Sequence, residues 1–237
     1  MRDVVFANVS RRAFLASALA ALAGCAGGRS ALRSANILPV SPAEMPDKVP
    51  APTLRAGDWW AYIQRDQLTG LETNRGRFHI TSVTDAGYQI REEWQQGGVV
   101  TAFYNRDLNP VRTYNLSFTP AFPRFSFPLF IGKSWQADVV KSDVPPKQFG
   151  TVRQQVNGSV GGWDRITVPA GTFTAVRIDL TIVWRVTDAA SARGSSRETV
   201  WYVPTINTIA LSRREDFYGD FQVINDSVLE LAGIGTA

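Results

Sequence analysis

The feature that most constrains the fold is an alternating stretch of seventeen residues, Thr172 to Asp188 (TFTAVRIDLTIVWRVTD). From Val176 to Val186 every even-numbered position is apolar, whereas the odd-numbered positions from 177 to 187 are polar except at Val183. A period of two is typical of a β-strand with one buried face and one solvated face. The preceding PAGTF, Pro169 to Phe173, predicts a tight turn, because proline fixes φ and glycine tolerates a positive φ.

The same alternation recurs from residue 57 onward, and no stretch there has the period of an amphipathic helix. Short turns, such as Asp85 to Gly87 and Asn157-Gly158, separate the apolar stretches, and we predict a single strand over 111–118. The sequence therefore predicts an all-β fold, an antiparallel meander of about eleven strands. Such a sheet curls over its apolar face into a half-open or a closed barrel.

Composition indicates one folded domain, for which we predict the bounds 57–233, followed by a tail at 234–237. With 44% hydrophobic residues and 11% aromatics, the chain is too apolar for a disordered protein. The net charge of +4 falls to about +2 once the residues before Cys25 are removed, because three basic groups and one acid are lost from 25 and 21. No stripe of Lys and Arg accompanies this excess, which argues against a nucleic-acid partner.

The first 24 residues have the organisation of an export signal. A basic segment with Arg11 and Arg12 precedes an apolar run from Ala13 to Ala23, which is too short to span a bilayer as a helix. The run Ser10 to Leu15 resembles the twin-arginine export motif, with ordinary secretory export as the alternative.

The end of this segment, Leu22 to Cys25, resembles a bacterial lipobox, in which the cysteine becomes acylated; a chance cysteine is the alternative. Acyl chains on Cys25 would provide a stable membrane anchor. Ala26, where an aspartate would favour retention in the inner membrane, points to the periplasmic face of the outer membrane. From residue 25 to residue 56 five prolines and no apolar period predict a semi-rigid tether.

Two apolar stretches are candidates for the wall of a ligand cavity. Glu92 shares its predicted face with apolar neighbours, so it either orients the polar head of a ligand or pairs with an arginine. The candidate cavity residues are Tyr88, Ile90, Glu92, Trp94, Ile178, Leu180, Ile182 and Trp184.

The segment Thr119 to Gly132 combines three prolines with a run of phenylalanines, which excludes both a helix and a central strand. We expect either a loop folded over one end of the core or a lid over a cavity. The candidate lid residues are Phe122, Phe125, Phe127 and Phe130.

Catalytic chemistry has little support in the sequence, so we assign no catalytic residue, no metal site and no cofactor. The chain has one histidine, His79, which alternates onto the wet face of its predicted strand. With Cys25 acylated, no thiol remains to join it in a metal site or to act as a nucleophile. The adjacent acids Glu92 and Glu93 project to opposite faces of a strand and cannot form a facing pair.

Four motifs in this order carry a resemblance to a known group: Asp58-Trp59-Trp60, 128–135 (PLFIGKSW), 168–173 (VPAGTF) and 201–204 (WYVP). They resemble the markers of a group of bacterial envelope domains with a PAGTF motif. These domains are in turn remotely similar to the lipoprotein carriers LolA and LolB, which hold acyl chains in a half-open barrel. The carriers cover the barrel mouth with helices, which this sequence does not predict.

Together these features predict a non-catalytic envelope lipoprotein that binds a lipid or another amphiphile in an apolar cavity. The alternatives are a subunit of an envelope assembly that binds another protein, and a hydrolase of envelope glycans. Expected partners are therefore the membrane through Cys25, an amphiphile, and an envelope protein.

Overall fold

The computed structural model describes residues 36–144, 150–187, 192–219 and 222–236. The described residues belong to one compact unit. The export motif at Arg11 and Arg12 and the acylation site at Cys25 lie outside the described residues. Among the residues described, no helix combines the length and hydrophobicity of a membrane span.

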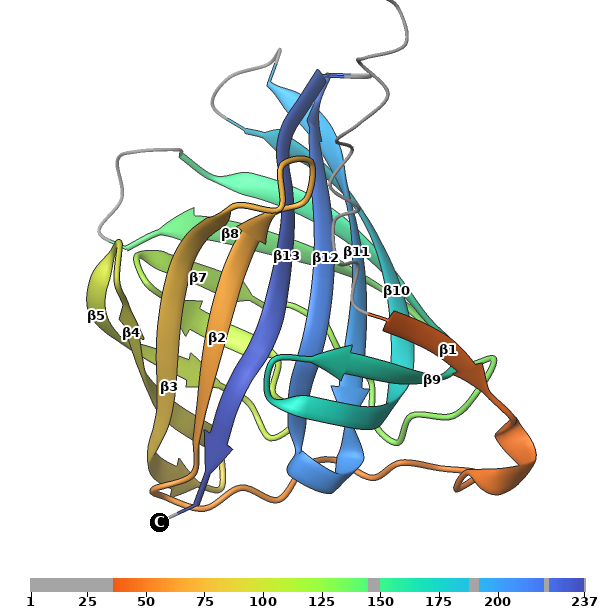
Figure 1. Ribbon diagram of the computed structural model, residues 1–237. Helices are drawn as coiled ribbons and strands as arrows, with labels where there is room; N and C mark the ends of the chain where they lie inside the picture. The colour runs from red at the N-terminus through yellow and green to blue at the C-terminus, as the bar shows by residue number, and fades with distance from the viewer. Residues whose placement is uncertain (1–35, 145–149, 188–191, 220–221, 237) are drawn as a thin grey trace, which may run out of the picture. The chain divides into compact units, whose positions relative to one another are not determined.

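The described part of the chain is all-β, as predicted, with thirteen strands and two short 3-10 helices (Figure 1). The helices are η1 (Pro42–Glu44) and η2 (Pro204–Ile206). The strands are β1 (Asn36–Val40), β2 (Trp59–Asp66), β3 (Glu72–Thr84), β4 (Gly87–Trp94), β5 (Gly98–Tyr104), β6 (Pro110–Thr113), β7 (Leu116–Thr119), β8 (Ser134–Asp143), β9 (Val152–Val168), β10 (Gly171–Val186), β11 (Arg193–Val203), β12 (Thr208–Tyr218) and β13 (Gln222–Gly235).

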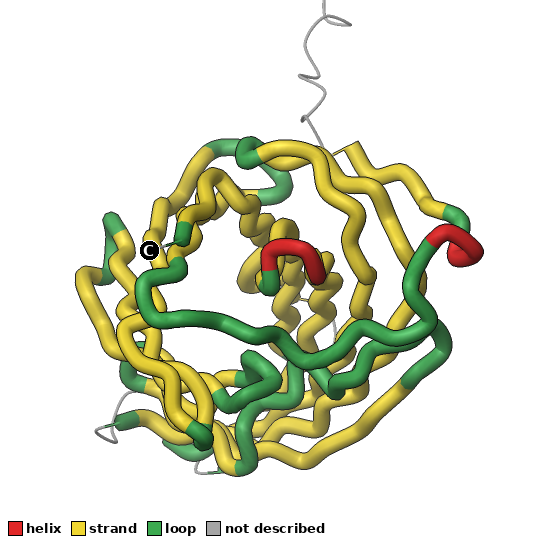
Figure 2. Tube along the Cα trace, turned by 90° about the horizontal axis from the view of Figure 1, so that it is seen from below, coloured by secondary structure: helices red, strands yellow, loops and turns green. Residues whose placement is uncertain are grey.

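Twelve antiparallel strands, β2 to β13, close into a barrel. Each strand pairs with its neighbour in sequence, β13 pairs with β2, and β8 pairs with β9 to complete the circle. Viewed along its axis, the sheet forms a ring (Figure 2). The structure thus selects the closed barrel over the half-open form, and β1 is an additional strand outside the circle.

Strand β9 serves two neighbours because it changes partner along its length. Its first half pairs with β8 up to Ser159, and its second half pairs with β1 from Trp163 onward. Between the two halves Gly162 has a φ of 155°, and the pairing with β10 shifts register between Arg177 and Ile178. This bulge bends the strand out of the barrel wall, which frees an edge for β1.

Two details of the predicted strand order were wrong. The dipeptide Asn157-Gly158 is not a turn, because both residues pair with β10 inside the continuous strand β9. The predicted strand over 111–118 is a hairpin of two strands, β6 and β7, in which Tyr114 has a φ of 50°. At Asn157 the pairing with the neighbouring strands overrides the local preference of Asn-Gly for a turn. At Tyr114 the alternating pattern of the segment conceals the turn.

Residues 36–56, within the segment expected to be a tether, pack on the barrel. Besides β1, Val49 exchanges two backbone hydrogen bonds with Leu129, each 2.8 Å long. The Tyr88 hydroxyl donates to the Pro52 carbonyl at 2.9 Å. These contacts hold the segment across the end of the barrel where η2 and the last residues of β13 lie, called the lower end from its place in Figure 1. The last residues of β10 and β12 mark the upper end.

Candidate functional site

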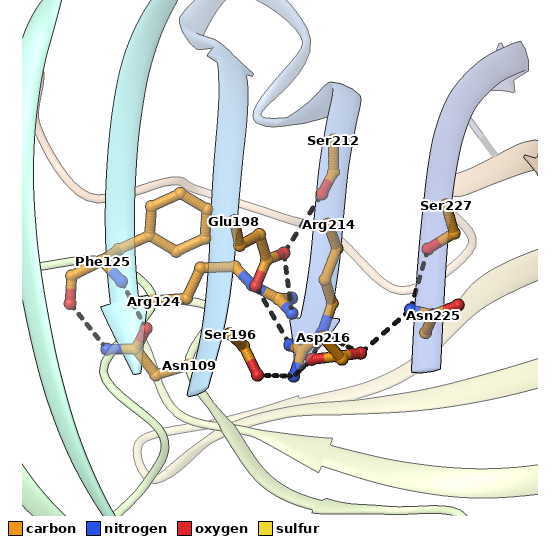
Figure 3. Close-up of polar contacts among 10 residues, drawn as sticks. All are labelled: Asn109, Arg124, Phe125, Ser196, Glu198, Ser212, Arg214, Asp216, Asn225 and Ser227. Atoms are coloured by element: carbon orange, nitrogen blue, oxygen red, sulfur yellow. Dashed lines mark hydrogen bonds and ion pairs between the residues drawn. The ribbon is translucent and has the colours of Figure 1, made fainter. Parts of the chain in front are cut away.

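The loop from 120 to 133 enters the barrel as a plug at its lower end. The side chain of Asn109 holds it through two hydrogen bonds of 2.8 Å to the backbone of Phe125, one accepted and one donated (Figure 3). Trp135 Nε1 donates to the Pro123 carbonyl at 2.8 Å. Prolines cannot donate to a sheet, so these side-chain bonds supplement the few backbone bonds of the loop, such as those between Leu129 and Val49.

The four candidate lid residues divide between the plug and the surface. Phe122 and Phe125 are buried and Phe127 is half-buried, whereas Phe130 is 40% exposed. The rings of Phe125 and Phe127 lie 5.5 Å apart, and each lies 5.4 Å from the ring of Tyr202 on β11. The first three therefore belong to the plug and fill the lower interior.

An alternating chain of charges crosses the interior above the plug (Figure 3). Arg124, from the plug, lies 3.4 Å from Glu198 on β11, and Arg214 on β12 lies 3.4 Å from the other oxygen of the same carboxylate. Arg214 also contacts Asp216 at 2.9 Å. Register places Glu198 and Arg214 opposite each other on the inner face of the barrel. Buried charges are normally paired in this way because an isolated ion loses its hydration.

Neutral side chains complete the network. Ser212 donates to Glu198 at 3.1 Å, and Asn225 donates to Asp216 at 2.9 Å. Desolvation raises the pKa of Asp216, but hydrogen bonds from Arg214, Ser196 and Asn225 together with the Arg214 charge outweigh it, so the pKa is lowered. The Asp216 carboxylate is thus stabilised as an anion by Arg214 and its neutral neighbours.

Two more titratable side chains, Glu92 and Lys141, face the interior, and Glu92 forms no ion pair with an arginine among the described residues. Burial raises the pKa of Glu92, an effect that a 2.8 Å hydrogen bond from the Tyr104 hydroxyl reduces. On β8, burial and the charge of Arg214 lower the pKa of Lys141, while Asp216 and Asp143 oppose this shift. An arginine was one expected partner of Glu92, but the side chain that binds its carboxylate is the hydroxyl of Tyr104.

Three tryptophans lie flat against the inner wall because a glycine stands opposite each one. Trp94 pairs in register with Gly76, Trp135 with Gly158, and Trp184 with Gly194. A Cβ atom built on any of these glycines would come within 2.6 Å of the facing indole ring. The indoles therefore cover the backbone of the neighbouring strand instead of projecting across the barrel.

Several inward-facing side chains of the upper interior keep accessible surface, and from this we infer an open space there, called the lumen. Arg124 keeps 23% and Arg214 keeps 33% of its side-chain surface accessible, although both lie inside the ring of strands. Trp94, Tyr104 and Trp184 also face inward and are only half-buried. Their own strands cover them from outside, so this accessible surface faces the space inside the barrel.

Two polar atoms of inward-facing side chains are shielded from solvent and lack partners in the described protein. Arg124 Nε and Gln154 Oε1 are buried and make no hydrogen bond to the described protein. Gln154 faces inward on β9, opposite Trp184 of β10. An unpaired buried donor or acceptor costs free energy.

The eight predicted cavity residues all face the barrel interior, at two levels. Five are fully buried, and of these Leu180 and Ile182 lie in register with Glu198 and Ser196 of the network: Tyr88, Ile90, Ile178, Leu180 and Ile182. Trp94 and Trp184 line the lumen, and Glu92 lies at its floor through its contact with Tyr104. His79 pairs with Trp59 and Arg91 on the outer face.

Sequence reasoning missed the residues that make the lumen polar, namely Arg124, Lys141, Glu198, Arg214 and Asp216. In β12 polar residues occupy both faces (Arg213, Arg214, Glu215, Asp216), so the alternation did not indicate which of them face inward. In β11 a signal existed, because Glu198 shares the period of Val200 and Tyr202. Among the described residues, no group of three or more His, Cys, Asp or Glu side chains could hold a metal ion.

A pocket of about 190 Å³ opens at the lower end between Leu54, Trp60, Ile206 and Ile234. Ligand pockets usually measure about 300 Å³ or more. This pocket is also remote from the charged network, so the lumen remains the candidate site.

No family model matches the chain, and a search of curated proteins finds no match. Among solved structures the fold is similar to that of a predicted lipoprotein from Parabacteroides distasonis, with a TM-score of 0.52 and 14% identity over 80% of this chain and 100% of that one. Two further structures are a predicted exported protein with a YmcC-like fold from Bacteroides fragilis (TM-score 0.48, 11% identity, 80% and 100% covered) and the hypothetical lipoprotein YmcC from Escherichia coli (TM-score 0.41, 9% identity, 76% and 86% covered). The similarity to the first structure shows a shared barrel fold.

Proposed function

We propose that this chain is an exported lipoprotein, anchored by acyl chains on Cys25 to the periplasmic face of the outer membrane, and that its barrel binds an amphiphile without catalysis. The export signal and the lipobox-like Leu22 to Cys25 support the anchor. The lipoprotein description of the similar Parabacteroides structure is in keeping with it.

The observation that carries the binding proposal is the mixed wall of the lumen. Indole panels at Trp94 and Trp184 offer flat apolar surface, while Arg124 and Arg214 offer accessible donors a short way along the same space. A ligand with an apolar body and a polar head matches both surfaces. The expected apolar cavity is thus replaced by one that is polar toward its floor.

The glycan-hydrolase alternative gains no support from this geometry. Glycoside hydrolysis needs one carboxyl group that stays protonated and a second that is ionised across the substrate. Glu198 and Asp216 both bind Arg214. The pKa of Asp216 is lowered by this contact, so Asp216 does not supply the protonated carboxyl group.

Organic extraction and mass spectrometry of the full-length protein purified from membranes, followed by displacement of a fluorescent fatty acid, test the proposal. Trp184→Ala removes a lumen indole and should weaken displacement on the order of ten-fold. Trp59→Ala is the matched control, because Trp59 lies over Gly235 on the outer wall.

Absence of extracted amphiphile together with equal fatty-acid binding by both variants would rule out the lumen as the binding site. Crosslinking in membranes separates the remaining alternative, since an assembly subunit should yield one stoichiometric protein partner even when the lumen is empty.

A further inference from the structure

The upper outer face of the barrel carries three arginines in one row. Arg185 on β10 pairs in register with Arg153 on β9 on one side and with Arg193 on β11 on the other. All three are exposed. They form the arginine row, and they lie on strands β9 to β11 at the end where β10 ends in Figure 1.

Like charges placed directly opposite each other destabilise a sheet. No ion pair joins Arg153 or Arg185 to an acid within the described ranges, so their repulsion is not relieved there. An anionic surface that meets several strands at once would relieve it. The row therefore has the electrostatics of a binding surface for an extended anion.

The next row of the same outer face carries three apolar side chains besides Gln155 and Ser195. Val183, Phe217 and Val223 lie in one register row across β10, β12 and β13, with Ser195 between the first two. Val183 and Val223 are exposed, as is the neighbouring Ile224. This apolar row, from Val183 to Val223, adjoins the arginine row.

We infer that the arginine row and the apolar row together bind the surface of an anionic lipid bilayer. Basic side chains attract anionic headgroups, and adjacent aliphatic and aromatic side chains insert at the headgroup boundary. The surface would orient the barrel on the membrane to which Cys25 attaches it. This inference does not need the lumen to be occupied.

The length of chain before β1 allows this arrangement. Eleven residue steps separate Cys25 from Asn36, which corresponds to a reach of at most about 35–40 Å. Asn36 pairs with Thr167, fourteen steps along β9 from Arg153. At about 3.3 Å per residue and a tilt of about 40°, that separation is roughly 35 Å along the barrel axis. An anchor at Cys25 can therefore lie in the plane that the arginine row contacts.

Co-sedimentation of the full mature chain carrying Cys25→Ser tests the surface without an acyl anchor. Binding is expected to vesicles that mix phosphatidylglycerol into phosphatidylcholine, to fall with added salt, and to be weak with phosphatidylcholine alone. Arg153→Gln with Arg185→Gln should weaken binding about thirty-fold. Arg55→Gln with Arg112→Gln is the control, since both are exposed arginines on other parts of the surface.

Cys25 is the only cysteine, so Cys25→Ser leaves a single labelling site when another residue is changed to cysteine. A polarity-sensitive fluorophore at Ile224→Cys should shift to the blue on anionic vesicles. The same label at Ile234→Cys, at the other end of β13, should not; the two positions are 54% and 40% exposed. Equal vesicle binding by both arginine pairs, equal shifts at both labels, or capture of an acidic protein without vesicle binding would overturn the inference.

Discussion

The lower and upper halves of the barrel interior are built on the same strands and yet differ in packing. Along β10, Ile178 is fully buried in the lower half, whereas Trp184, six residues further on the same face, borders the lumen. Along β11, Tyr202 packs against the plug, whereas Glu198 joins the charged network. The difference therefore does not come from the sheet.

The difference between the two halves comes from what the barrel encloses. Eight strands make a barrel that side chains can fill, and twelve make one that is wider than side chains can cross. The plug fills the lower half with Phe122 and Phe125, and nothing comparable from the described loops reaches the level of Trp184. Glycines opposite the indoles keep the upper space open. One closed sheet can thus provide stability at one end and a binding space at the other.

The largest expected contrast lies between Ile178 and Trp184. Ile178→Ala should lower the free energy of unfolding by about 3 kcal/mol, because it leaves a cavity in a packed core. Trp184→Ala should cost only about 1 kcal/mol, since the indole already borders open space. Denaturant unfolding of both variants measures this, and a cost for Trp184→Ala equal to that for Ile178→Ala would show that the upper half is packed too.

The charged network marks the boundary between the halves, and Glu198 is its centre. Glu198→Ala leaves Arg124 and Arg214 without their shared carboxylate, which should cost about 2–3 kcal/mol. Glu198→Gln keeps the acceptor for Ser212 and should cost less. Thermal unfolding of the two variants at neutral pH makes the comparison. A negligible loss for Glu198→Ala would mean that water in the lumen already solvates both arginines.

Period-two alternation was sufficient to predict the fold class and the central strand. From Val176 to Ile182 the even positions are buried, and the turn at Gly171 falls where PAGTF predicts it. The number of strands was harder to predict from the sequence, because a turn such as that at Tyr114 depends on φ values that many residues can adopt. Barrel closure through β8 and β9 joins segments whose pairing no local pattern specifies.

For a related reason, the site could be predicted only in part from the sequence. Alternation shows that Trp94 and Trp184 face inward, but whether an inward residue is packed or borders a lumen depends on where the plug ends. The glycine opposite each indole was not recognisable either, since Gly76 and Trp94 become neighbours only through the register of β3 and β4. Membership of Arg124 in the network depends on the path of a loop that has no period.

The open upper half also depends on the glycines that face the indoles. In Gly76→Ala the new methyl group would lie 2.6 Å from the Trp94 ring, so the ring must tilt into the lumen. We expect a loss of about 1–2 kcal/mol in unfolding free energy together with weaker fatty-acid displacement. Trp94→Phe in the same chain should restore part of both, because the smaller ring clears the methyl group. A double-mutant cycle with no coupling would contradict this contact.

The smallest expected effects are changes of stability with pH, and they have opposite signs for the interior carboxylates Asp216 and Glu92. The Asp216 pKa is lowered, so its stabilisation is present above its unfolded-state pKa and is lost as the pH falls through the folded-state value. Asp216→Asn should therefore cost about 1.5 kcal/mol at neutral pH and progressively less in acid. The Glu92 pKa is raised by burial, so the protonated form is favoured and the stabilisation is lost as the pH rises through the folded-state value.

Glu92→Gln should consequently match or exceed the wild-type stability at neutral pH, by at most about 1 kcal/mol, and lose that advantage below the ordinary glutamate range. The amide oxygen still accepts from Tyr104, so the comparison isolates the charge. Melting temperatures of wild type and both variants across a pH series provide the measurement. Parallel curves for the two variants would mean that the Glu92 carboxylate is stabilised as an anion, as that of Asp216 is, and would contradict a raised Glu92 pKa.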